Sequence, residues 1–204
     1  MGELEGPSIF RLEFRSDPEK HVSVVSLRME DRDAFLRRVS DRVRISRRRQ
    51  ALVFIHGFNV SFEDATRRAA QIAYDLGFDG APIVFSWPSQ GGAGPLDYQH
   101  DVRNADLSAD TLYQFLNDLT QSTNEIRVDV IAHSMGNRVL SAALQRFAAL
   151  TQSGRIRRFQ HVALLAPDID AELFRRVAPQ IASTAQRMTL YASSRDVALE
   201  LSRR

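Results

Sequence analysis

Residues Ala132-His133-Ser134-Met135-Gly136 combine a serine with small residues two positions before it and two positions after it. An apolar run at 128–131 precedes them and a helical pattern at 137–150 follows. A serine on such a sharp strand-to-helix turn is held out from the sheet, and the flanking residues must be small because the two backbones nearly touch. The spacing predicts Ser134 as the nucleophile of an acyl-transfer reaction, with Ala132 at a position where glycine is commoner.

A second segment, Phe54-Ile55-His56-Gly57-Phe58-Asn59, ends an apolar run further upstream. The tetrahedral intermediate of acyl transfer carries an oxyanion, which needs backbone N–H donors fixed in advance. A His-Gly turn after the first parallel strand commonly supplies one donor, and the residue after the nucleophile supplies another. We therefore predict an oxyanion hole formed by the N–H groups of Phe58 and Met135.

An acid that orients the general base is expected just past a strand that follows the nucleophile. Asp196 satisfies this after the last expected strand and is the favoured residue, while Asp168 in Ala166-Pro167-Asp168 is the alternative. Either carboxylate could instead cap the following helix, and for Asp170 capping is the better interpretation.

The general base is harder to find, because a histidine after the acid is expected and no histidine follows Asp196. His100, in the irregular stretch 87–101, is the alternative base, set against a role as an ordinary surface histidine. The other four histidines have other predicted positions. His21 lies in the N-terminal hairpin, and His161 lies at the end of the sheet opposite the nucleophile. His133 precedes Ser134 in the strand and points away from it, and His56 belongs to the oxyanion turn.

The elements that must position these residues alternate between short apolar runs and longer helical patterns, which indicates a mostly parallel sheet flanked by helices. Strands are expected at 51–56, 83–87, 127–133, 161–166 and 188–193, and helices at 62–76, 104–120, 135–150 and 171–181, with another beginning near Asp196. Residues 9–14 and 22–27 alternate like an antiparallel edge hairpin, followed by a charged helix at 31–43. We expect a single domain over 1–204, with the hairpin and helix in 1–50 and the parallel core in 51–204.

The composition excludes several classes of protein. The chain has 204 residues, is 44% hydrophobic and contains no cysteine, so disulfides, thiolate nucleophiles and cysteine-based zinc sites are ruled out. Apolar runs of about five residues are far shorter than the roughly 20 of a membrane-spanning helix. The acidic N-terminus does not resemble a signal peptide, so a cytoplasmic location is expected. With 27 basic and 25 acidic residues, nucleic-acid binding has little support beyond the arginine clusters at 47–49 and 155–158.

Four segments together resemble the α/β-hydrolases known as domain of unknown function 900. They are 53–65 (Val-Phe-Ile-His-Gly-Phe-Asn onward), 84–89 (Val-Phe-Ser-Trp-Pro-Ser), 131–138 around Ser134, and 166–170 (Ala-Pro-Asp-Ile-Asp). The resemblance implies an esterase or lipase-like serine hydrolase that uses Ser134 and has no metal or other cofactor. It also implies that the histidine-bearing C-terminal segment of the family is absent here, since the sequence stops at Arg204.

Two functions remain open at this point. The first is hydrolysis of a small carboxylic ester through an acyl-enzyme on Ser134. The second is a catalytically impaired protein of the same fold that binds acyl ligands or a partner chain, with self-association through an exposed sheet edge.

Overall fold

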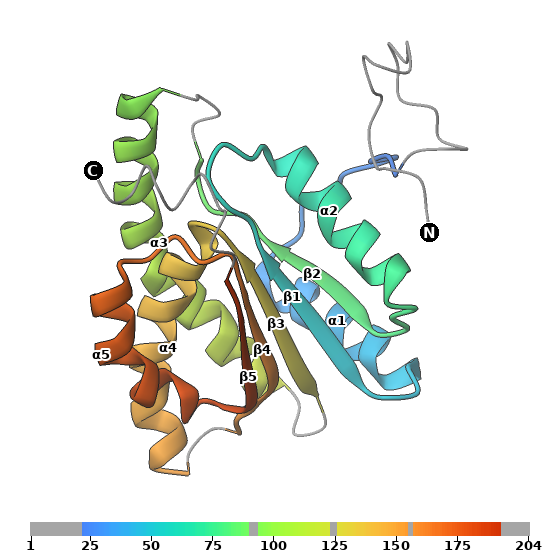
Figure 1. The fold of residues 1–204 in the computed structure, drawn as a ribbon. Helices are drawn as coiled ribbons and strands as arrows, with labels where there is room; N and C mark the ends of the chain where they lie inside the picture. The colour runs from blue at the N-terminus through green and yellow to red at the C-terminus, as the bar shows by residue number, and fades with distance from the viewer. Residues whose placement is uncertain (1–21, 90–93, 123–125, 155–156, 193–204) are drawn as a thin grey trace.

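The computed structural model describes residues 22–89, 94–122, 126–154 and 157–192, and these build one five-stranded, fully parallel sheet. The strand order is β2-β1-β3-β4-β5 (Figure 1). The chain therefore adds β2 on one side of β1, and then adds β3, β4 and β5 in turn on the other side. The strands are β1 Gln50–Ile55, β2 Ala81–Phe85, β3 Arg127–His133, β4 Phe159–Leu165 and β5 Ala185–Tyr191. The predicted α/β class is confirmed, with strand ends within three residues of those expected.

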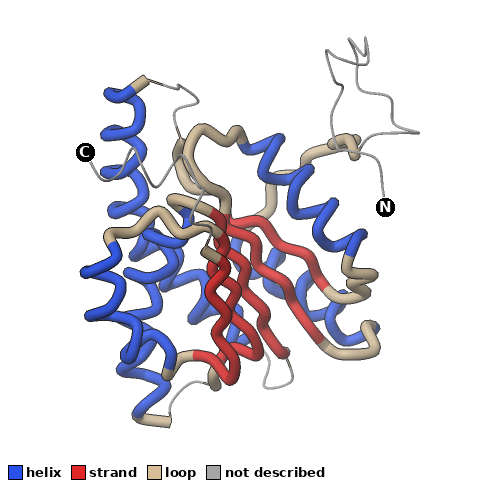
Figure 2. Tube along the Cα trace, viewed as in Figure 1, coloured by secondary structure: helices blue, strands red, loops and turns tan. Residues whose placement is uncertain are grey.

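Helices cover the two faces of this sheet unequally (Figure 2). On one face α2, Phe62–Asp75, packs against β1 and β2. The other face holds a continuous series in which α1 contacts α3, α3 contacts α4 and α4 contacts α5. The bounds of that series are α1 Arg32–Ile45, α3 Pro95–Ser122, α4 Gly136–Gln152 and α5 Ala171–Ala182.

The burial pattern of β3 records this asymmetry. Val128, Val130 and Ala132 are buried under α3 and α4, whereas the alternate residues on the other face are partly or fully exposed. The core beneath contains fully buried Leu112, Leu116 and Phe147 among others. Each such side chain stabilises the fold by about 1.5–3 kcal/mol relative to exposure. The core of the protein therefore lies on the face of the sheet that α3 and α4 cover.

The N-terminal region differs from the expectation. The predicted helix is present as α1, which begins after Asp31, whose carboxylate accepts a hydrogen bond from the N–H of Ala34 at 2.7 Å. Residues 22–31 form no strand, so the second strand of the predicted edge hairpin is wrong; its first strand, 9–14, lies outside the described residues. Val25 and Leu27 are 92% and 69% exposed, so alternation of apolar and polar residues here does not reflect a buried sheet face.

The helix predicted at 104–120 is longer than expected, because α3 begins at Pro95. Residues 95–101 therefore belong to a helix and not to the irregular loop predicted for 87–101. Proline suits the first helical position, since it has no N–H to leave unpaired there. Asp97 accepts a hydrogen bond from the N–H of Gly94 at 3.0 Å, which secures the start of the helix. The first turns of α3 extend above the carboxyl ends of the strands in Figure 1.

Candidate active site

Ser134 occupies the turn between β3 and α4 with a φ of 49°. This left-handed conformation is rare for a residue other than glycine and requires support from its surroundings. The backbones that meet there are very close: a Cβ on Gly136 would lie 2.5 Å from the carbonyl oxygen of His56, and one on Gly57 would lie 2.9 Å from the Cβ of Ser134. The turn has the shape that the sequence predicts for a nucleophile elbow.

The peptide groups of Ser134 are held by neighbouring segments. Its N–H donates to the carbonyl of Leu165 at 3.0 Å, and its carbonyl accepts from the N–H groups of Asn137 and Asp168 at 3.0 and 3.2 Å. The buried amide of Asn137 also donates to the carbonyls of Ser134 and Leu165, at 2.9 and 3.0 Å. These bonds over-determine the left-handed turn, which allows the strained conformation to persist.

The two predicted oxyanion donors lie on the two sides of this turn. Met135 is the N-cap of α4, where backbone N–H groups lack helical partners and the helix dipole is positive. Phe58 follows β1 in the loop 57–60, and Gly57 of that loop approaches Ser134. The ring of Phe58 packs edge-on against Tyr98 of α3, with centroids 5.5 Å apart.

His56 is committed to the frame of this loop, as the sequence predicts. It is 1% exposed, it bonds the carbonyl of Gly57 through Nδ1 at 2.9 Å and Ser86 Oγ through Nε2 at 3.2 Å, and it stacks on Trp87. Because a carbonyl only accepts, Nδ1 carries the proton and Nε2 accepts from the Ser86 hydroxyl. Burial lowers the pKa of His56, which keeps the ring neutral.

Of the two candidate acids, the structure describes only Asp168. Asp196 lies outside the described residues. Asp168 is 6% exposed, and its carboxylate accepts a hydrogen bond from the Tyr98 hydroxyl at 2.9 Å. Burial raises the pKa of Asp168, although Tyr98 and the nearby charge of Arg138 oppose that rise. Asp170 caps α5, accepting from the N–H groups of Glu172 and Leu173, as its position in the sequence predicts.

The remaining histidines lie apart from one another. His100 is exposed on α3, about 200° around the helix from Tyr98 at 100° per residue, so it is turned away from the loops that Tyr98 contacts. His133 is exposed at the end of β3, beside Gly57. His161 is bonded to Asp129 at 2.9 Å near the amino ends of the strands. His21 lies outside the described residues, and among those described no histidine nitrogen is hydrogen-bonded to Ser134.

Two residues that contact the site were not singled out from the sequence: Asn137 and Tyr98. Tyr98 belongs to the first turns of α3, in a stretch that the sequence predicts as a loop. Pro95 followed by Asp97 was the signal that could have revealed that helix. Asn137 directly follows the small residue that identifies the elbow, but an amide at that position has no pattern of its own.

A cavity of about 520 Å³ adjoins the elbow on the side of α2. Its walls include Phe54, Val60, Ile72 and Leu165, with His133 and Gly57 at the end nearest Ser134. Asp64, Arg68 and His56 also line the cavity, so apolar and charged groups share its walls. Apolar walls with a few polar groups are typical of small-molecule sites.

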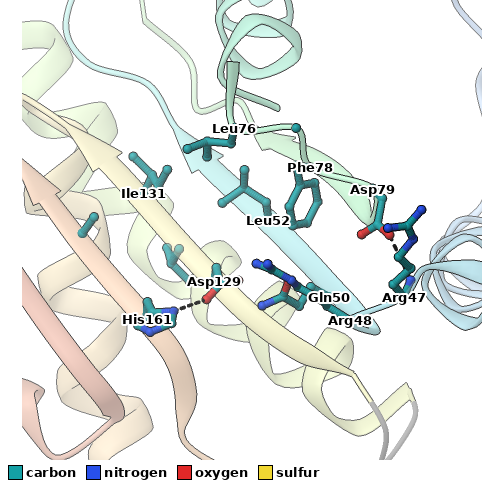
Figure 3. Close-up of a pocket in the computed structure, with 13 residues that line it drawn as sticks. Arg47, Arg48, Gln50, Leu52, Leu76, Phe78, Asp79, Asp129, Ile131 and His161 are labelled. Carbon is teal, nitrogen blue, oxygen red and sulfur yellow. Dashed lines mark hydrogen bonds and ion pairs between the residues drawn. The ribbon is translucent and has the colours of Figure 1, made fainter. Parts of the chain in front are cut away.

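A second cavity, of about 620 Å³, lies at the other end of the sheet, between the end of α2 and the faces of β1, β3 and β4 (Figure 3). Leu52, Ile131 and Phe78 provide its apolar surface, and the pair Asp129–His161 lies at its edge. Burial raises the pKa of Asp129 despite the adjacent imidazole. The cavity contains none of the residues around Ser134.

Backbone strain gathers at the carboxyl edge of the sheet. Among the described residues, four that are not glycine have a positive φ, and three of them follow strands at this edge: Asn59 after β1, Ser134 after β3 and Ala166 after β4. Because these strands are neighbours, the strained residues surround one region. Clustering of strain is common at functional sites.

A family model described as "Alpha/beta hydrolase of unknown function (DUF900)" matches residues 31–204. The chain belongs to this family. The match covers both the elbow and the loop after β1, so the resemblance noted from four short segments is confirmed across most of the chain. None of the curated proteins matches the sequence.

Membership of an α/β-hydrolase family indicates hydrolase activity in general. Within the described ranges, no group of three or more His, Asp or Glu side chains is arranged to hold a metal ion. In the same part of the chain, none of the helices combines the length and apolar character needed to cross a bilayer.

Proposed function

We propose that this DUF900 hydrolase cleaves small carboxylic esters through an acyl-enzyme formed on Ser134. The observation that carries the proposal is the left-handed turn at Ser134, fixed between β3 and the N-terminus of α4. A buried structural serine has no need of this strained conformation, whereas a nucleophile exposed above the sheet does.

In the proposed reaction, Ser134 Oγ attacks the ester carbonyl while its proton passes to a general base. The N–H groups of Met135 and Phe58 stabilise the oxyanion of the tetrahedral intermediate. The base then returns the proton to the departing alcohol, which leaves an acyl-serine. A water molecule attacks this ester in the same way and releases the carboxylic acid. The cavity beside Gly57, with apolar walls from Phe54, Ile72 and Leu165, is suited to the acyl or alcohol part of a small ester.

The proposal keeps Asp196 as the acid that orients the base and Asp168 as the alternative. The order rests on position in the sequence, since Asp196 follows the last expected strand. His100 remains the candidate base within the chain, and it would reach Ser134 only after a rearrangement of the first turns of α3.

The test is hydrolysis of p-nitrophenyl acetate and butyrate by the wild type, Ser134→Ala and His100→Ala, together with labelling by a fluorophosphonate. We expect Ser134→Ala to abolish turnover and labelling. Loss of turnover in His100→Ala as well would identify the base, while retained turnover would assign it to another group. Turnover that persists in Ser134→Ala would refute the proposed mechanism.

The second candidate is a catalytically impaired protein that binds acyl ligands or a partner. It is favoured by the absence of any histidine bonded to Ser134 among the described residues. In the described sheet β5 pairs only with β4, so its outer edge could join a second copy. This candidate predicts binding of butyrate esters without turnover, and a dimer in light scattering; a monomer with Ser134-dependent turnover would exclude it.

A further inference from the structure

Asp101, on the second turn of α3, is a carboxylate with no exposed surface. Burying a charge is costly unless hydrogen bonds compensate it, so its partners show what the residue does. Ser89 Oγ donates to Asp101 Oδ2 at 2.5 Å, and the N–H of Asn59 reaches the same oxygen at 3.4 Å. The carboxylate therefore lies between Ser89, in the segment after β2, and the loop that follows β1.

A second N–H of that loop is held through Ser89. The hydroxyl of Ser89, whose proton goes to Asp101, accepts from the N–H of Val60 at 3.4 Å. Asp101 thus acts on two consecutive backbone donors, Asn59 directly and Val60 through the serine. Both follow Phe58, the proposed oxyanion donor.

The conformation of this loop needs such support. Asn59 has a φ of 53°, in the left-handed region, and its side chain is exposed. One turn before Asp101 on the same helix, Tyr98 packs against the ring of Phe58. The first turns of α3 therefore hold the loop at its backbone and at its aromatic side chain.

We propose that Asp101 is a positioning residue that fixes loop 57–60 so that the N–H of Phe58 is directed at the oxyanion formed on Ser134. The inference rests on the proposed function for its catalytic consequence. Asp101 does not touch the substrate; it acts through Ser89 and the backbone of Asn59. A donor fixed before the reaction stabilises the transition state more than the bound ester, so its displacement lowers kcat and leaves KM nearly unchanged.

The test compares Asp101→Asn and Ser89→Ala with the wild type on p-nitrophenyl butyrate. Asp110→Asn is the matched control, since it removes the same charge from the same helix at an exposed ion pair with Arg146. Removing an oxyanion donor costs about 100- to 1,000-fold in kcat, so displacing one is expected to cost roughly 10- to 100-fold. We expect this loss in Asp101→Asn, a smaller loss in Ser89→Ala, and none in the control.

A transition-state analogue separates positioning from general damage. An alkyl trifluoromethyl ketone forms a hemiketal oxyanion with a serine, so its Ki should rise by the factor by which kcat/KM falls. A merely structural Asp101 would instead lower the melting temperature and leave the Ki and kcat of the folded fraction unchanged. That result would overturn the inference.

Amide hydrogen exchange tests the same point without activity. In Asp101→Asn and in Ser89→Ala, the amides of Phe58, Asn59 and Val60 should exchange faster, while that of Val130 in β3 should not. If Ser134→Ala retained full turnover, the proposed function would fail and the exchange result would still decide whether Asp101 holds the loop. If turnover needs Ser134 but Asp101→Asn keeps wild-type kcat, Ki and exchange rates, the inference alone fails.

Discussion

Replacing Gly136 by alanine sets two physical effects against each other. Gly136 begins α4, and alanine is favoured over glycine by about 1 kcal/mol within a helix. Its new Cβ, however, would lie 2.5 Å from the carbonyl oxygen of His56 and 2.7 Å from that of Ile55. Both contacts are backbone atoms of the chain leaving β1, so no side chain can swing away to relieve them.

Overpacking of this kind typically costs about 1–3 kcal/mol, and more where backbone must move. We therefore expect Gly136→Ala to destabilise the protein by about 1–3 kcal/mol, against the direction of helix propensity. For a chain of this size, 1 kcal/mol shifts Tm by about 2–4 °C, so a decrease of roughly 2–12 °C should be seen by calorimetry. Turnover of p-nitrophenyl butyrate should fall too, because the displaced turn carries Ser134.

Gly77→Ala is the control. Gly77 has a φ of 56° and nothing within 4 Å of its added Cβ, so the substitution introduces backbone strain without a clash. It should cost about 1–2 kcal/mol and leave the turnover of folded protein unchanged. A Tm that is unchanged or raised in Gly136→Ala would show that strand and helix do not meet as closely as described, and would refute the reasoning.

Three further predictions concern the surroundings of Ser134. Asn137→Ala removes two buried hydrogen bonds and should lower the unfolding free energy by about 1–3 kcal/mol in urea titration; an unchanged midpoint would contradict the role given to this amide. Burial lowers the pKa of His56 in the folded protein. As the pH falls below about 6.5, the unfolded chain therefore takes up a proton on this histidine before the folded protein does. The stability that the neutral ring contributes is complete above that pH and is lost as the pH falls toward the lower pKa of the folded protein. His56→Gln should therefore show a shallower loss of Tm than the wild type as the pH falls below about 6.5, and equal slopes would refute this. Tyr98→Phe removes the donor to buried Asp168 and should lower Tm at pH 7. The difference from the wild type should shrink as the pH falls and the carboxyl group, whose pKa is raised, takes a proton; a constant difference would show that the carboxylate charge is not involved.

The elbow could be predicted from the sequence because its determinants are local. Ala132 and Gly136 flank Ser134 within five residues, between a strand and a helix with clear periodicity. His56 and Gly57 could be interpreted only together with Ser134, because a His-Gly pair at the end of a strand is by itself an ordinary strand exit. Gly57 does approach Ser134 closely, and the role of this turn in an oxyanion hole stays a prediction.

The residues that support the loop after β1 could not be found in this way. Asp101 and Asn59 are 42 positions apart, and their contact depends on how far α3 extends above the sheet. The glycines and prolines between 88 and 95 suggested a long irregular loop, although Pro95 in fact begins the helix. The alternation of apolar and polar residues at 22–27 wrongly predicted a strand, since Val25 and Leu27 are exposed and do not form a buried face.

The strained residues at the carboxyl edge bear on how this protein would respond to selection. Asn59 and Ala166 hold left-handed conformations that glycine adopts without steric cost. Substitutions that remove this strain would therefore stabilise the folded protein. Laboratory evolution that selects only for heat resistance would accept substitutions that remove the strain at this edge of the sheet. Because the same edge surrounds Ser134, such variants would be expected to trade catalytic competence for thermal tolerance. Thermostabilisation of this hydrolase should therefore target the helical surface and leave the turns after β1, β3 and β4 untouched.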